Sequence, residues 1–214
     1  MWLIDVGPDF ARVNAELIDA YRLTAPANVG HVLDHGFADP CIRPVYRGAR
    51  AVGSAFTVQI ESMDVAAISK AYELAGPGDV LVVAAGGDRK FACAGEMSTF
   101  RSIRMGLAGL VVDGSVTDVR EMEIMNFPCF ARHITPLVGR CIGEKGSVRQ
   151  PVIIGGVLVR PGDLVLADDN GVVFLDPAEA TRIIDELLEK ERKEDELRKA
   201  FWSERGQAVP VIYS

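Results

Sequence analysis

The sequence lacks the paired cysteines of small metal-binding modules and of disulfide-stabilised domains. It has four cysteines, which are scattered along the chain without a Cys-x-x-Cys pair. This spacing speaks against a structural zinc site and against a disulfide framework. Most of them are therefore expected to be small buried apolar residues. They are Cys41, Cys93, Cys129 and Cys141.

Positive charge is also scarce. The chain carries 23 lysine and arginine residues against 30 aspartate and glutamate residues, a formal net charge of -7, and it has no basic cluster. This balance argues against a nucleic-acid partner held through its phosphates. Small acids or a protein partner fit better, provided that a cation supplies the attraction.

Several familiar ligand-binding motifs are missing as well. No Gly-x-x-x-x-Gly-Lys-Ser/Thr loop and no Gly-x-Ser-x-Gly elbow is present, and the Gly86-Gly87 loop lacks the three-glycine dinucleotide fingerprint. His31 and His35 are four residues apart and could share a metal. Without a third ligand motif nearby, helix-surface or core histidines are the favoured interpretation.

The first residues have no basic region and are interrupted by Asp5 and Pro8, so they resemble neither a signal peptide nor a membrane span. We therefore expect no membrane partner and a cytoplasmic location. With 214 residues, of which 49% are hydrophobic, the chain can bury a full core. One compact domain over residues 1–214 is the simplest organisation.

Apolar periodicity predicts an α/β fold in which helices and strands alternate. The clearest strand signal is the continuous apolar run at 80–85, which is typical of a strand covered on both faces. Asp64 is the expected cap of one helix. Helices are predicted at 9–23, 27–34, 64–75, 95–105 and 119–125, strands at 51–60, 80–85, 108–112, 128–131 and 172–175, a loop at 40–50, and a hairpin turn at 168–171.

The C-terminal region is predicted to be one long charged helix. Asp176, Pro177 and Glu179 supply an N-cap, a first-turn proline and a capping-box glutamate in order. Opposite charges then recur four residues apart, which indicates a solvated face that projects from the body toward a neighbouring subunit. The expected pairs are Glu186 with Lys190, Glu189 with Lys193, and Glu194 with Arg198.

The stretch 111–121, VVDGSVTDVRE, changes from apolar to acidic within a few residues. In open α/β sheets the ends of buried strands border ligand crevices, so the acids here are candidate site residues. If a helix begins near Thr117, Asp118 and Glu121 share one face of its first turn. The alternative is that Asp113-Gly114 makes a turn and that Thr117 or Asp118 only caps the helix.

Six blocks along the chain occur in an order and spacing that resemble a known family. They are 78–83 (GDVLVV), 95–96 (GE), 106–114 (GLAGLVVDG), 127–132 (FPCFAR), 161–163 (PGD) and 167–173 (ADDNGVV). Together they are similar to the family that unites 4-hydroxy-4-methyl-2-oxoglutarate aldolases with the regulator of ribonuclease activity A, most clearly from about Val52 to Glu179. The resemblance implies a layered β-β-α sandwich that assembles into homotrimers or homohexamers, with active sites between subunits.

The resemblance also implies a reaction. The aldolase members cleave a carbon-carbon bond in a 4-hydroxy-2-oxo acid to release pyruvate, many decarboxylate oxaloacetate, and they use Mg²⁺ or Mn²⁺. Cleavage leaves negative charge on the former keto oxygen, which a hard divalent cation stabilises as a Lewis acid. Such a cation keeps several waters, so one direct carboxylate suffices.

The resemblance assigns roles to two segments of this chain. Asp118 matches the family's metal ligand, and Glu121 matches the acid that holds metal-bound water, which makes these two the candidate catalytic residues. The backbone N–H groups of Met97 and Ser98, at a helix start, would hold the substrate carboxylate. The candidate substrate-binding residues are Gly95, Glu96, Met97, Ser98 and Thr117.

Thr117 departs from the family pattern, because the aldolases have an arginine there that contacts the keto oxygen. Threonine is short and neutral and donates only one hydrogen bond. Losing such a contact costs roughly 10²- to 10³-fold in rate. Either Arg120, Arg89 or another arginine supplies the charge, or the substrate differs, or aldol cleavage is lost.

Two functions follow from these observations. The first is a divalent-metal-dependent lyase that acts on small 2-oxo acids. The second is a non-catalytic regulatory or binding protein like the ribonuclease regulator. Asp118 and Glu121 favour the first function, and Thr117 favours the second or a changed substrate.

Overall fold

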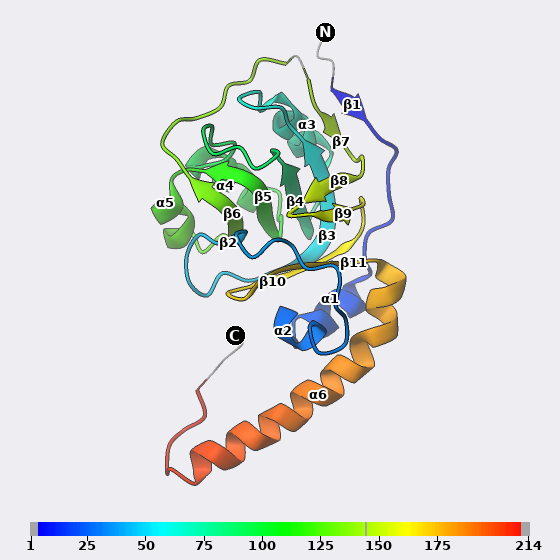
Figure 1. Cartoon of the computed structure of the whole chain (residues 1–214), viewed down its shortest axis with the longest axis vertical. Coiled ribbons are helices and arrows are strands. Elements are labelled where there is room, and N and C mark those ends of the chain that lie inside the picture. The colour runs from blue at the N-terminus through cyan, green and yellow to red at the C-terminus, as the bar shows by residue number, and fades with distance from the viewer. Residues whose placement is uncertain (1–3, 144, 211–214) are drawn as a thin grey trace.

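The computed structural model describes residues 4–143 and 145–210, which form a mixed α/β fold around one large sheet (Figure 1). Four neighbouring parallel strands make its centre; the first three are buried along almost their whole length, and the fourth is buried in its first half. These strands are β3 (Ala51–Gln59), β4 (Asp79–Ala84), β5 (Gly109–Val116) and β6 (Cys129–Ile134).

Short strands extend the sheet on both sides, in the order β1-β7-β3-β4-β5-β6-β2. Along its other edge β3 pairs antiparallel with β10 in its first half and with β7 near its end. The strands β10 and β11 form the hairpin predicted around the turn at 168–171. The bounds are β1 (Asp5–Val6), β2 (Arg43–Pro44), β7 (Ser147–Val148), β10 (Leu164–Asp168) and β11 (Gly171–Leu175).

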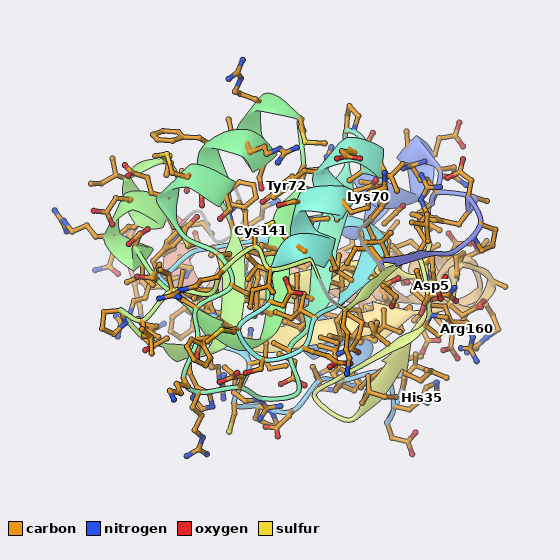
Figure 2. The ribbon with its side chains drawn as sticks, turned by 90° about the horizontal axis from the view of Figure 1, so that it is seen from above. Asp5, His35, Lys70, Tyr72, Cys141 and Arg160 are labelled. Atoms are coloured by element: carbon orange, nitrogen blue, oxygen red, sulfur yellow. The ribbon has the colours of Figure 1, made fainter. Side chains whose placement is uncertain are left out.

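Three helices cover one face of the sheet. They are α3 (Ala66–Leu74), α4 (Glu96–Arg104) and α5 (Val119–Ile124), and Figure 2 shows α3 and the green helices on the same side of the strands. Phe56 and Leu81 of the sheet pack in one apolar cluster with Met122 of α5, all fully buried. Each such side chain contributes roughly 1.5–3 kcal/mol through its burial.

The opposite face of the sheet is covered by strands. The hairpin of β8 (Val152–Ile154) and β9 (Val157–Val159) packs there with β10 and β11. Val82 and Phe130 of the central strands join Ile154 in this second apolar cluster. The layered β-β-α arrangement predicted from the sequence is therefore confirmed.

A further helical layer covers the outer face of the β10–β11 hairpin. It consists of α1 (Ala15–Tyr21), α2 (Pro26–Val29) and α6 (Pro177–Ser203). Within the described residues, no side chain of α6 beyond Leu187 is buried, and the rest of this helix extends away from the body (Figure 1). No helix in the described part of the chain is long and apolar enough to cross a membrane.

The charge pairs of α6 follow the prediction in part. Glu189 pairs with Lys193 at 3.2 Å and Glu194 with Arg198 at 3.8 Å, as expected. Lys190 pairs with Glu194 at 2.8 Å instead of with Glu186. The side chains of these pairs are partly or largely exposed to solvent, so each pair adds only a few tenths of a kcal/mol to the helix.

The two N-terminal helices are shorter than predicted. The first begins at Ala15, where the side chain of Asn14 caps it by accepting from the Leu17 N–H at 2.8 Å. The residues before it form no helix, and Arg12 among them pairs with the buried carboxylate of Asp79 at 2.8 Å. The second helix ends at Val29 rather than continuing to residue 34. Tertiary contacts therefore override a helical pattern in the first case.

Of two predicted helix caps, Asp64 does bind the start of its helix, from one position further out than expected, whereas the other differs. Helix α3 begins at Ala66, one position after Val65, and Asp64 accepts from Ala66 N–H at 3.0 Å while also binding the backbone at Ile142. Glu179 does not complete a capping box, because its carboxylate binds His35 at 3.0 Å. That contact ties His35 to α6 and does not join it to His31.

The strand predicted at 108–112 continues to Val116, so Asp113-Gly114 is part of β5 and not a turn. The buried carboxylate of Asp113 is compensated by Arg132 at 2.6 Å and by the Gly155 N–H at 2.7 Å. The pairing with β6 shifts between Val112 and Ser115, as at a β-bulge. The partners of Asp113 are distant in the sequence, so the residues of the strand alone did not indicate that a buried aspartate could be part of it.

Two of the four cysteines follow the prediction. Cys93 and Cys129 are buried, and burial raises the pKa of the Cys93 thiol to about 12. Cys41 and Cys141 are exposed, so the prediction is wrong for them.

Replacing Arg132 tests how much the buried charge pair matters. Arg132→Leu leaves Asp113 buried without its cation, and we expect the free energy of unfolding to fall by about 3 kcal/mol in urea titrations. Arg120→Leu is the control, because Arg120 is 78% exposed and its ion pair with Glu123 is long, at 3.9 Å. Equal losses in both variants would contradict the assignment.

The turn before β10 gives stability a pH dependence. Asp163 is 6% exposed, and burial raises its pKa from 3.8 to about 6, while its Oδ2 accepts from the Arg160 N–H at 2.7 Å. Between these values the folded protein binds the proton more tightly than the unfolded chain, so stability falls as pH rises from about 4 to 6.

Asp163→Asn keeps an acceptor for Arg160 but cannot ionise. We expect it to be more stable than the parent at pH 7.5 by on the order of 2 kcal/mol, with no difference below pH 4. Urea unfolding across this range measures the difference, with exposed Asp185→Asn as the control. A pH-independent difference would refute the explanation.

Candidate functional site

The candidate site lies where β5 ends and α4 and α5 begin. The segment before α4 runs alongside the end of β5, with the Cys93 N–H donating to Ser115 O at 3.0 Å and the Thr117 N–H donating to Ala94 O at 2.9 Å. These two bonds bring the start of α4 against the start of α5. The two sequence segments that were predicted to form one site are therefore adjacent in the fold.

Gly95 allows this close approach. A Cβ atom at this position would lie 2.4 Å from Oδ2 of Asp118 and 2.7 Å from Cγ2 of Thr117, closer than non-bonded atoms approach. Any larger residue would push the two helix starts apart. The requirement for glycine here is steric rather than conformational, because its φ is -163°.

Asp118 has an unusual backbone conformation for a residue with a side chain. It precedes α5 with φ 54° and ψ 40°, in the left-handed region that aspartate tolerates better than most residues. Its exposed carboxylate accepts from the Glu96 N–H at 2.9 Å through Oδ2 and from the Thr117 hydroxyl at 3.1 Å through Oδ1.

The carboxylate therefore faces α4 rather than its own helix. Asp118 makes no side-chain cap bond to α5, and the hydroxyl of Thr117 is directed at Asp118. The alternative in which these residues only cap a helix after an Asp113-Gly114 turn is wrong, because β5 continues through that dipeptide. The sequence hypothesis of a ligand site at the end of the strand remains.

The first turn of α4 presents free hydrogen-bond donors. The Ser98 hydroxyl binds the Gly95 N–H at 2.8 Å, and the Glu96 N–H is taken by Asp118. The N–H groups of Met97 and Ser98 have no partner among the described residues. Free N–H groups at the positive end of a helix attract anions, and Met97 is 66% exposed.

Tyr72 supports this first turn from α3. Its hydroxyl donates to Ser98 O at 3.0 Å and lies 2.9 Å from the Ser102 hydroxyl, and Figure 2 shows Tyr72 between α3 and the green helices. The guanidinium of Arg101 covers its ring at 4.7 Å. Tyr72 lies in the helix predicted at 64–75, but nothing in the sequence indicates its contact with a residue 26 positions away.

Glu121 is the third residue of α5 and is partly buried. In the described part of the chain its carboxylate has no hydrogen bond or ion pair, so it is free to bind a ligand or water. Neither arginine proposed as a substitute for the family arginine contacts Asp118 or Thr117. Arg120 pairs with Glu123, while Arg89 lies near His133, whose pKa burial and this positive charge lower.

The donor set fits a hydrated Mg²⁺ or Mn²⁺ rather than a metal held entirely by protein. Among the residues that the structure describes, no three His, Cys, Asp or Glu side chains cluster tightly enough to hold a metal alone. A carboxylate offers about four lone-pair directions, and the two hydrogen bonds to Asp118 leave the others open to solvent. Such cations bind through one or two carboxylates and keep several waters.

The fold and the site can be compared with known proteins. Residues 14–174 match the family model described as RraA-like, Aldolase/RraA. The chain belongs to the RraA-like family. This match spans the four central strands β3 to β6 and both segments of the candidate site.

Several similar proteins are named as aldolases. The chain is 36% identical over 168 residues to a putative 4-hydroxy-4-methyl-2-oxoglutarate aldolase of Halalkalibacterium halodurans, covering 78% of this chain and 79% of that protein. It is 34% identical to the Thermus thermophilus protein named 4-hydroxy-4-methyl-2-oxoglutarate aldolase, over 65% and 85% of the two chains.

A similar solved structure is named as an inhibitor. Streptomyces coelicolor RraAS2, described as an unusual member of the RNase ES inhibitor RraA protein family, superposes with a TM-score of 0.77 at 28% identity, over 88% of this chain and 100% of its own. The resemblance found in the sequence is confirmed. The family name alone does not choose between an enzyme and an inhibitor.

Gly95→Ala tests the close approach at the site. The added methyl collides with Asp118 and Thr117, and we expect the free energy of unfolding to fall by about 1–3 kcal/mol in urea titrations. Gly76→Ala is the matched control, because its Cβ would meet only the tip of Arg12 at 3.7 Å. If both variants lose the same stability, the contact at Gly95 is looser than the structure indicates.

Proposed function

We propose that the protein is a divalent-metal-dependent lyase that acts on small 2-oxo acids. It releases pyruvate by retro-aldol cleavage of a 4-hydroxy-2-oxo acid, by decarboxylation of oxaloacetate, or by both. The observation that carries this proposal is the Asp118 carboxylate, exposed and oriented beside the free Met97 and Ser98 N–H groups. A carboxylate that can hold a cation and amides that can hold an anion together fit a 2-oxo acid.

Each group of the site has a role in this proposal. The N–H groups of Met97 and Ser98 bind the carboxylate of the substrate and set its orientation. Asp118 holds Mg²⁺ or Mn²⁺, and Glu121 holds a water of its hydration shell. When bound, the cation supplies Lewis-acid stabilisation of the charge that develops on the keto oxygen. Glu96 and Gly95 fix the Asp118 carboxylate and admit it to the start of α4.

The proposed assembly is a homotrimer or homohexamer with the site near a subunit boundary. Four large apolar side chains are exposed on α4 and α5. Such a group of exposed apolar residues is typical of a protein–protein interface. They are Met97 at 66%, Phe100 at 45%, Ile103 at 44% and Ile124 at 70%. The α6 helix, which leaves the body after Leu187, is the element that could reach another subunit.

The second candidate function is regulation by binding, as the name of the Streptomyces relative indicates for that protein. Thr117 favours it, because no guanidinium of the described residues contacts the carboxylate site and the electrophilic assistance that arginine would give is missing. Asp118 and Glu121 argue against it, since a pure binding module needs no exposed, oriented carboxylate.

A coupled pyruvate assay tests the lyase. We expect Mg²⁺- or Mn²⁺-dependent turnover of oxaloacetate or of 4-hydroxy-4-methyl-2-oxoglutarate, reduced at least roughly 10²-fold by Asp118→Ala because the cation loses its ligand. Glu123→Ala, an exposed acid on the same helix, should leave turnover unchanged. If neither substrate shows metal-dependent turnover, or if Asp118→Ala retains it, the lyase is rejected for these substrates and regulation becomes the better proposal.

A further inference from the structure

We propose that Thr117 is a positioning residue, whose hydroxyl holds the Asp118 carboxylate in the orientation that binds the divalent cation. The inference rests on the proposed function, in which Asp118 is the metal ligand. The neutral side chain at position 117 then contributes to metal binding.

The hydrogen bonds on Asp118 leave its carboxylate little freedom to rotate. Oδ1 accepts from the Thr117 hydroxyl at 3.1 Å, and Oδ2 accepts from the Glu96 N–H at 2.9 Å. One donor lies in the chain before Asp118 and the other on α4, so the two oxygens are held from different sides. A rotation of the carboxylate would break at least one of these bonds.

The hydroxyl of Thr117 is itself oriented by packing. Threonine is branched at Cβ and therefore stiff about its first side-chain torsion. Its Cγ2 methyl lies against Gly95, 2.7 Å from where a Cβ would be, and its N–H is bound to Ala94 O at 2.9 Å. The methyl thus occupies the side toward α4, and the hydroxyl is left to point at Asp118.

A hydroxyl at this position has an electrostatic consequence. It donates a hydrogen bond to the carboxylate without placing a positive charge next to the cation that the carboxylate binds. Carboxylate ligands depend on the groups that hydrogen-bond to them, and removing such a partner typically weakens metal binding about 10- to 100-fold.

Replacing Thr117 by valine or by serine separates the hydroxyl from the methyl. Thr117→Val keeps the branched shape against Gly95 and removes the donor, whereas Thr117→Ser keeps the donor. We expect Thr117→Val to weaken Mn²⁺ binding about tenfold, with Thr117→Ser within about threefold of the parent. Electron paramagnetic resonance of free Mn²⁺, titrated with protein and without substrate, measures the affinity, and circular dichroism checks folding.

Asp118→Asn tests the metal site independently of the role of Thr117. If Asp118→Asn abolishes Mn²⁺ binding and Thr117→Val binds like the parent, Thr117 is not a positioning residue and the proposed metal site stands. If the parent does not bind Mn²⁺, or Asp118→Asn binds it equally well, the metal site itself is wrong. Should Thr117→Val fail to fold, Thr117→Ala compared with Thr117→Ser answers the same question, and equal affinities there overturn the inference.

Discussion

The contact between the Asp118 carboxylate and the Glu96 N–H joins two helices that begin far apart in the sequence. Almost every feature of the candidate site depends on it. It requires glycine at position 95, holds Asp118 in a left-handed backbone conformation, and turns the carboxylate toward the open amides of α4. A strained conformation of this kind costs of order 1–3 kcal/mol and persists only where surrounding contacts hold it.

The layers of the fold supply those contacts. The neighbouring parallel strands β4 and β6 hold β5 in place, and the segment before α4 runs beside the C-terminal end of β5. Tyr72 of α3 then binds the first turn of α4, so three helices on one face of the sheet share the task of positioning a single turn. The family's shared fold explains the position of the site, while its chemistry in this chain depends on Thr117.

Reasoning from the sequence was accurate where one physical signal dominated. The buried strands, the hairpin at 168–171 and the helices before and after β5 have apolar periodicity or turn chemistry that no distant contact overrides. It failed at residues 9–14, which are not helical and where Arg12 pairs with Asp79, and at Asp113, whose charge is neutralised by Arg132. In both places a long-range ion pair decided the local structure.

The α/β class, the family and the identity of the acids at the end of β5 could be predicted from the sequence, because they follow from periodicity, block order and residue type. The fold was needed to show that Asp118 faces α4, that Gly95 leaves room for it, and that the Thr117 hydroxyl donates a hydrogen bond to it. Those facts depend on distances between segments about twenty residues apart, which the folding of the sheet brings together and which no local pattern encodes.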